Sequence, residues 1–179
     1  NRNSYTKLPA PVGIPRFDGP GTQALYHPNG EYLYLLYAQN DYLSILKIDG
    51  DTYTRKYSTY VEASRGAISP SGTHFVVNGG QHKLTFYKLN YDGTVNEFLN
   101  YPSVLPTTGV QDLAYSPDGR FLVVIYVASP YMLIYKIDGE IYPKAPDPLS
   151  IPSIYAHSVA VPPNNNHLIF GQYRGNRLQ

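Results

Sequence analysis

The sequence predicts an all-β protein built from a repeated unit of four short antiparallel strands. Three observations support this class. Aromatic residues make up 14% of the 179 residues, with 19 Tyr, 6 Phe and no Trp, and such residues favour strands. The 16 Pro and 15 Gly interrupt the chain too often for long helices. A turn containing Pro and Gly, followed by an apolar strand, recurs along the chain. We therefore expect almost no helix.

The repeat is anchored on a proline turn. The segments HPNGEYLYLLYA, SPSGTHFVVNGG and SPDGRFLVVIYVA share an X-Pro-X-Gly turn and an apolar strand, and VPPNNNHLIFGQ keeps the Pro but replaces the Gly with Asn. Subtracting the residue numbers of successive turn prolines gives spacings of 42, 47 and 45 for Pro28, Pro70, Pro117 and Pro162. This period is typical of a β-propeller blade. The predicted fold is a β-propeller of four-stranded antiparallel blades, with about four blade equivalents.

Each unit divides into four predicted strands. A short strand precedes the proline turn and a long apolar strand follows it. The third strands end at Asp-Gly type reversals, with Lys47, Lys88 and Lys136 in equivalent places. The fourth segments, DTYTRKYS, TVNEFLNY and EIYPKAPD, are polar, as expected of an exposed outer strand. The resulting units are approximately residues 20–62, 63–108, 109–152, and 153–179 completed by 1–19.

The two ends of the chain match complementary parts of one unit. The opening NRNSYTKL resembles a turn and an outer strand, and the closing HLIFGQYRGNRLQ stops as a third strand begins. Two architectures fit a single domain of residues 1–179. Either the N-terminal strand completes the last unit and closes a four-bladed ring, or the chain is part of a larger propeller. The first residue is Asn1, so we interpret the chain as a mature product or a segment of a longer polypeptide.

Composition excludes several classes of function. With 14 Lys and Arg against 13 Asp and Glu, the net charge is +1, so no basic surface is available for nucleic acid. The longest apolar run, 121–128, is too short to span a bilayer. The absence of Cys removes thiolate nucleophiles and Cys-ligated zinc. The five His show no compact ligand spacing, and no nucleotide-binding or hydrolase motif is present. We expect no metal, no cofactor and no membrane insertion.

One polar set is a candidate ligand site. The residues five positions before the turn prolines are Gln23, Arg65, Asp112 and His157. These positions lie at the entrance of the innermost strand, so in a propeller they surround one mouth of the central channel. Ligand sites commonly form where polar groups converge in such a way, and an Arg, an Asp and a His together could bind an anion or transfer a proton. Alternatively, each side chain solvates a loop, or Arg65 and Asp112 pair across the mouth.

Tyrosines provide a second candidate surface. Most of them lie on predicted strands, where packing between sheets explains them. Four are flanked by Pro and are expected to be exposed, namely Tyr101, Tyr131, Tyr142 and Tyr155. A flat ring with a hydroxyl suits both sugars and protein partners. These four are the preferred contacts for a glycan or a receptor.

The third unit resembles a known type of repeat. The segment 109–152 is similar to WD40-like repeats found in bacteriophage tail and other virion proteins, and residues 116–119, 129–131 and 134–136 match the pattern most closely. The resemblance extends to all four units with decreasing fidelity. The same Ser-Pro-Asp-Gly turn also occurs in lactonase-like seven-bladed propellers. The resemblance thus indicates the fold strongly and the function weakly.

The resemblance implies a non-enzymatic virion module, structural or host-recognising, whose partners are other virion proteins, a host-surface glycan or protein, or further copies of the chain. Its expected location is the virion, with the cytoplasm or the extracellular space as alternatives. A second hypothesis is a lactonase-like hydrolase that uses Arg65, Asp112 and His157. A third is a cellular protein-interaction propeller. Hydrolysis of sugar lactones would separate the second hypothesis from the other two.

Overall fold

A computed structural model describes residues 20–37, 42–79, 83–97, 100–154, 156–164 and 167–172. These residues form thirteen β-strands and no helix, in agreement with the predicted all-β class. None of these segments contains a helix long and apolar enough to cross a membrane. The predicted completion of the last unit by residues 1–19 lies outside the described residues.

The strands form four sheets, which we call blades 1 to 4. Blades 1 and 2 have four strands each, in the orders β1-β2-β3-β4 and β5-β6-β7-β8. Blade 3 has the order β11-β10-β9, and the described part of blade 4 consists of β12 and β13. All the pairs are antiparallel. The strand bounds are Gly21–Tyr26 (β1), Tyr32–Tyr37 (β2), Tyr42–Asp49 (β3), Thr52–Tyr60 (β4), Gly66–Ile68 (β5), His74–Asn78 (β6), Leu84–Leu89 (β7), Val95–Glu97 (β8), Val110–Tyr115 (β9), Phe121–Tyr126 (β10), Met132–Lys136 (β11), Ala156–Ala160 (β12) and Ile169–Gln172 (β13).

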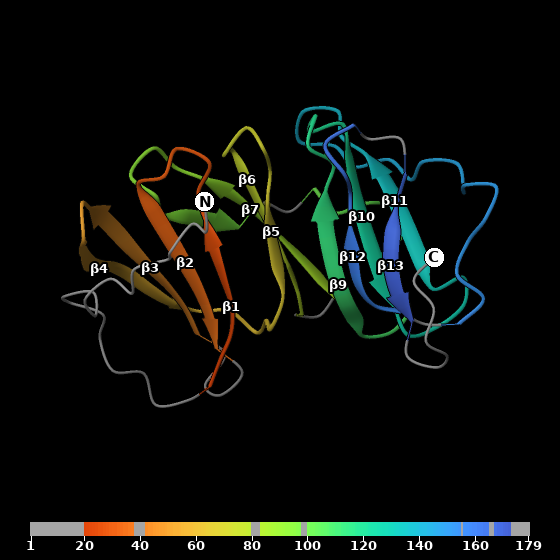
Figure 1. The fold of residues 1–179 in the computed structure, drawn as a ribbon, viewed down its shortest axis with the longest axis horizontal. Helices are drawn as coiled ribbons and strands as arrows, with labels where there is room; N and C mark the ends of the chain where they lie inside the picture. Colours follow the sequence, from red (N-terminus) through yellow and green to blue (C-terminus); the bar gives the residue numbers. More distant parts are fainter. Residues whose placement is uncertain are drawn as a thin grey trace, which may run out of the picture.

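The blades follow one another in an open arc. The inner strands β1, β5, β9 and β12 contact each other in that order, and Figure 1 shows blade 1 toward one end of the long axis and blades 3 and 4, which overlap in this view, toward the other. No comparable contact joins β1 to β12. Within the described residues, the sheets therefore form part of a propeller and do not close into a four-bladed ring.

The proline turns explain why each blade begins in the same way. In three blades the Gly of the turn donates its N–H to the carbonyl of the residue before the Pro, with N···O distances of 2.8 Å. Gly30, Gly72 and Gly119 have φ of 76°, 69° and 72°, a conformation that costs side-chain-bearing residues energy. The turns of blades 1 and 2 also touch, since His27 Nε2 lies 2.9 Å from the carbonyl oxygen of Gly72. At this junction the turns therefore connect neighbouring blades as well as reversing the chain.

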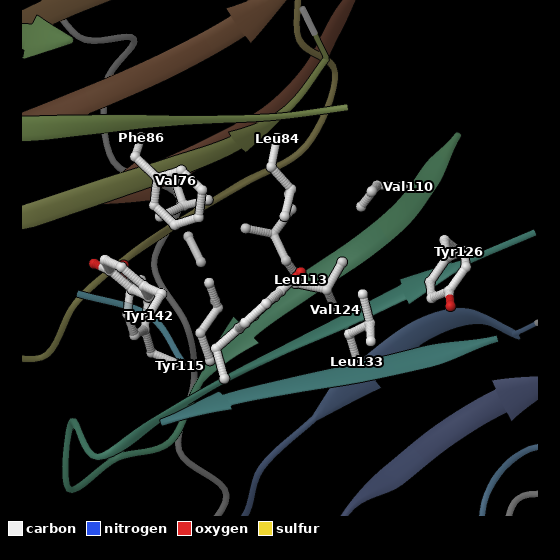
Figure 2. Packing of buried hydrophobic residues seen from close by; sticks show 13 residues of the cluster. Val76, Leu84, Phe86, Val110, Leu113, Tyr115, Val124, Tyr126, Leu133 and Tyr142 are labelled. Carbon is white, nitrogen blue, oxygen red and sulfur yellow. The ribbon is translucent and has the colours of Figure 1, made fainter. Parts of the chain in front are cut away.

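Apolar side chains fill the spaces between the blades. One cluster joins blades 1 and 2, and another joins blades 2 and 3. Figure 2 shows the second cluster, in which Phe86 from β7 faces Tyr142 from the segment after β11. Buried hydroxyls add hydrogen bonds across blades: Tyr34 of β2 donates to the carbonyl of Gly93 in blade 2, at 2.7 Å. Most of the tyrosines predicted to lie in the core are thus confirmed there.

The outer strand predicted for blade 3 does not form as a strand. The segment EIYPKAPD makes only isolated bridges, Asp138 with Ile141 and Tyr135 with Lys144. Pro143 and Pro146 have no N–H to donate to a ladder. The carbonyl of Pro143 still accepts from the N–H of Lys136, at 2.9 Å, so the segment follows β11 without pairing regularly.

Candidate functional site

Two of the predicted channel-mouth side chains connect neighbouring blades. Gln23 on β1 accepts, through Oε1, a hydrogen bond from the backbone N–H of Gly66 at 2.5 Å. Asp112 on β9 accepts, through Oδ2, a hydrogen bond from the N–H of Val159 at 2.9 Å. Gly66 and Val159 belong to the inner strands of the next blades. The same position of the repeat thus links blade 1 to blade 2 and blade 3 to blade 4.

Arg65 lies before β5 and contacts the preceding blade. Its Nη1 donates to the carbonyl of Thr22 at 3.3 Å and to that of Ser64 at 2.9 Å. A guanidinium has no acceptor atom, so Arg65 cannot copy the bonds of Gln23 and Asp112. Among the described residues, no ion pair joins Arg65 to Asp112 within 4.0 Å.

Asn78 makes the missing connection between blades 2 and 3. It ends β6, and its Nδ2 donates to the carbonyl of Val110 at 3.1 Å. Its Oδ1 accepts from the N–H groups of Ser64 and Arg65, at 2.8 and 2.7 Å. The sequence analysis missed Asn78. A signal was present in the sequence: β6 ends in an amide side chain, whereas the equivalent strands β2 and β10 end in Tyr37 and Tyr126.

His157 occupies a different position from the other three. The pairing of three inner strands shifts around one residue, which is Thr22 in β1, Gln111 in β9 and His157 in β12. His157 therefore corresponds to Thr22 and Gln111. Counting from Pro162 placed it one residue out of register, because the fourth turn contains two prolines. His157 is exposed.

Burial controls the charge of Asp112. Desolvation raises the pKa of its carboxyl above the usual 3.8, while the backbone N–H groups of Val159 and Leu113 and the nearby charge of Arg65 act in the opposite direction. Because Oδ2 of the half-buried Asp112 accepts the N–H of Val159, this oxygen connects blade 3 to blade 4. On these contacts, three members of the predicted quartet, Gln23, Arg65 and Asp112, connect neighbouring blades.

The four predicted surface tyrosines differ in exposure. Tyr142 is only 1% exposed and belongs to the core between blades 2 and 3, so its prediction as a surface contact is wrong. Its hydroxyl lies 3.2 Å from that of Tyr115, because the segment after β11 folds back over the sheet. Tyr101 is half-buried and donates to Glu97 at 2.8 Å. Tyr131, also half-buried, has φ of 68° in the turn after β10. Tyr155 lies outside the described residues.

Two cavities lie near opposite ends of the arc. One, of about 290 Å³, is lined by parts of β1 and β2 and includes the mouth residue Gln23. The other, of about 340 Å³, lies between blades 3 and 4. We call the second cavity the blade-4 groove. It is lined by Ser116, Phe121, Val123, Ile134, Ala145, Pro146, Val161 and Leu168. Seven of these eight side chains are apolar, so the groove favours an apolar occupant.

Several solved structures resemble this arrangement. A Bacteroides uniformis protein provisionally described as a 6-phosphogluconolactonase has a TM-score of 0.67 and 16% identity, with 83% of this chain and 46% of that chain covered. The Cps50 (Swd1) β-propeller domain of Myceliophteria thermophila has a TM-score of 0.66 and 15% identity, with coverages of 89% and 52%. A Lactobacillus plantarum protein has a TM-score of 0.67 and 11% identity, with coverages of 85% and 48%. No family model and no curated protein matches the chain.

The chain spans about half the length of these structures. At such identities the likeness concerns the fold and leaves the chemistry open. The open arc of antiparallel sheets and the similarity to a known propeller domain agree with the sequence period. The chain therefore has the β-propeller fold, with four blade equivalents.

Proposed function

We propose that this chain is a non-enzymatic propeller module that binds another protein. The observation that carries the proposal is the use of Gln23, Arg65 and Asp112 as bonds between blades. A catalytic group must reach its substrate with a free acceptor or donor. Here Oε1 of Gln23, Nη1 of Arg65 and Oδ2 of Asp112 contact backbone groups of the protein itself. The mouth is built to hold a rigid scaffold, and a rigid scaffold suits recognition through its loops.

A virion is the setting that we propose for this module. The support is the similarity of the third unit to repeats of bacteriophage tail proteins, with residues 116–119 as the best-matched turn. None of the solved structures named above is described as a virion protein, so this setting rests on sequence resemblance alone. The preferred partner is a protein of the particle or of the host surface.

A lactonase-like hydrolase is the alternative function, and the likeness in fold to the Bacteroides uniformis structure is the reason to test it. Such an enzyme needs a base near the mouth, and His157, which is exposed, is the member of the predicted set with the chemistry of a base at neutral pH. The two functions make opposite predictions for purified protein. A binding module leaves sugar lactones unchanged, whereas a hydrolase opens them and releases acid.

The test combines hydrolysis and capture. Acid release from sugar lactones is followed by pH-stat with the full chain and with His157→Ala. We expect both to match the buffer rate, and rapid hydrolysis that His157→Ala abolishes would overturn the proposal. In parallel, the immobilised chain and a heat-denatured control are exposed to extracts of particles and hosts. We expect the folded chain alone to retain a protein. Retention that disappears when glycans are removed would assign the module to a sugar ligand instead.

A further inference from the structure

The outer edge of blade 3 differs from the outer edges of blades 1 and 2. Those two blades end in the regular outer strands β4 and β8, whereas β11 of blade 3 is followed by residues 143–149, PKAPDPL, which we call the proline segment. Two backbone hydrogen bonds hold this segment on β11. The N–H of Lys136 donates to the carbonyl of Pro143 at 2.9 Å, and the N–H of Ala145 donates to that of Ile134 at 2.7 Å. Figure 1 shows this part of the chain, in light blue, at the end of the molecule away from blade 1.

The spacing of its prolines keeps the segment extended. Proline fixes φ at about −65°, here at Pro143, Pro146 and Pro148. Ala145 and Asp147 each precede a proline, and steric clash keeps such residues out of the helical region. All of these residues are described, and they contain no helix or turn. The restraints favour polyproline II, in which residues three apart lie on the same edge. Pro143 and Pro146 are three apart, and both are exposed.

The same prolines prevent a further strand from pairing with this edge. A strand ladder requires backbone N–H groups along the edge, and proline has none. The N–H of Ala145 is already bound to the carbonyl of Ile134. The segment therefore presents the rings of Pro143 and Pro146 to a partner in place of a row of donors. Recognition at this edge must depend on packing against those rings.

The charges of the segment cancel each other. Lys144 Nζ lies 2.6 Å from Asp147 Oδ1, so the segment carries no net charge. Apolar side chains flank it on both sides, since Ile141 and Leu149 are exposed. A partner surface that is apolar and uncharged complements such a segment, whereas a strongly charged surface gains nothing from it.

We propose that the proline segment is a docking site for an aromatic-lined groove of another protein, of the kind that binds polyproline II segments. The rings of Pro143 and Pro146 would pack against the aromatic side chains of the groove. Grooves of this kind exploit the fact that an extended proline segment loses little conformational entropy on binding. The inference rests on the proposed protein-binding function, and it names the contact surface and the chemistry of the partner.

The probe is a panel of purified domains of the SH3, WW and EVH1 classes, whose grooves are lined by aromatic side chains. The full chain contains no Trp, so the tryptophan fluorescence of a mixture comes from the domain. We expect at least one domain to show a saturable change in fluorescence as the full chain is added. A peptide of residues 141–150, IYPKAPDPLS, should compete with the chain for that domain, because it carries the same prolines.

Two variants of the full chain locate the site. The double variant Pro143→Ala, Pro146→Ala removes both rings and releases φ, so the domain should bind it at least about tenfold more weakly. Pro163→Ala changes an exposed proline outside the segment and should leave binding unchanged. Circular dichroism and a thermal melt establish that both variants are folded. A peptide with the two alanine substitutions should fail to compete, which tests the rings with unaltered protein.

Three results would overturn the inference. The first is the absence of a saturable response from every domain of the panel. The second is equal binding of the wild type and the folded double variant. The third is a dimer, seen by light scattering in place of the 20.0 kDa monomer, that the double variant dissociates, because the segment would then contact a second copy.

None of these results affects the proposed function, which fails instead on lactone hydrolysis. Domain binding that depends on Pro143 and Pro146, found together with His157-dependent hydrolysis, would keep the docking site and reject the non-enzymatic function.

Discussion

The junction between blades 2 and 3 and the junction between blades 3 and 4 use the same repeat but pack differently. The first is filled by thirteen buried residues, including Phe86, Tyr135 and Tyr142. Among the residues that the structure describes, the second has five buried residues and a groove beside them. Both junctions have an inner strand tied by a polar side chain, Asn78 in one and Asp112 in the other. Both junctions have such a tie, so the tie alone does not account for the difference in packing between them.

The largest expected effect compares one phenylalanine from each junction. Phe86→Ala should lower the free energy of unfolding by about 3–5 kcal/mol, because neighbours on both sides hold the cavity open. Phe170→Ala, at the junction with the groove, should cost only about 2–3 kcal/mol, since the loosely packed side can relax. Urea unfolding measures both values. Equal costs would show that the two junctions are packed to the same degree.

A second comparison uses the same turn position in two blades. A Cβ on Gly72 would lie 2.6 Å from the His27 ring, whereas a Cβ on Gly30 would meet no atom within 4 Å. Both residues have positive φ, so Ala should cost about 1–2 kcal/mol at either position. Gly72→Ala should cost about 1 kcal/mol more, because His27 must leave the carbonyl of Gly72. Thermal unfolding of the two variants gives the difference directly, and identical midpoints would contradict a structural contact between turns.

A third, smaller effect concerns Asp112 and pH. Burial raises the pKa of its carboxyl above the usual 3.8, so the folded protein favours the protonated form. The stability that this group contributes is fully present below pH 3.8 and is lost as the pH rises through the folded-state pKa. Asp112→Asn keeps an acceptor for Val159 and removes the charge.

We therefore expect the wild type to lose stability relative to Asp112→Asn between about pH 4 and about pH 7. Urea unfolding of both proteins at the two pH values measures this change. Gln23→Glu, which introduces a carboxylate at the equivalent position between blades 1 and 2, serves as a control. A wild type that gains relative stability toward neutral pH would indicate a stabilising ion pair of Asp112 instead.

The smallest expected effect concerns the ion pair between blades 2 and 3. Lys88 Nζ lies 2.9 Å from Glu140 Oε1, and the side chains are 57% and 45% exposed. Exposed pairs of this kind add little to stability. Glu140→Gln should leave the urea midpoint unchanged at high and low salt. A clear decrease in the urea midpoint at low salt would mean that this ion pair, in addition to apolar packing, stabilises the junction between blades 2 and 3.

The repeat made much of this fold predictable. The turn prolines and the apolar segments after them located the second strands, and the Asp-Gly reversals located the ends of the third strands. These signals are local, because a turn or a strand depends on neighbouring residues. The outer strand of blade 3 was predicted wrongly because Pro143 and Pro146 interrupt its ladder. Polar composition alone does not distinguish a paired edge from an unpaired one.

The candidate site was less predictable. Equivalent positions indicated Gln23 and Asp112 as candidate ligand contacts, whereas the hydrogen-bond partners that the structure shows lie 43 and 47 residues away in the next blade. Whether such a side chain faces a channel or a backbone N–H depends on the distance between blades, which no local pattern encodes. The same limit explains Tyr142, whose flanking Pro indicated exposure while the returning chain buries it against Phe86. The role of Asn78 depends on contacts of the same long range.

The buried tyrosine hydroxyls have a consequence for how the molecule would come apart. Tyr34 donates to the carbonyl of Gly93 and Tyr135 to that of Val104, and burial raises the pKa of both phenols above 10. A phenolate cannot donate a hydrogen bond, so these contacts persist below pH 10 and fail as alkali ionises the folded protein. With no Trp in the chain, the ultraviolet absorption of ionised tyrosine would include the ionisation of these two buried phenols as adjacent sheets part.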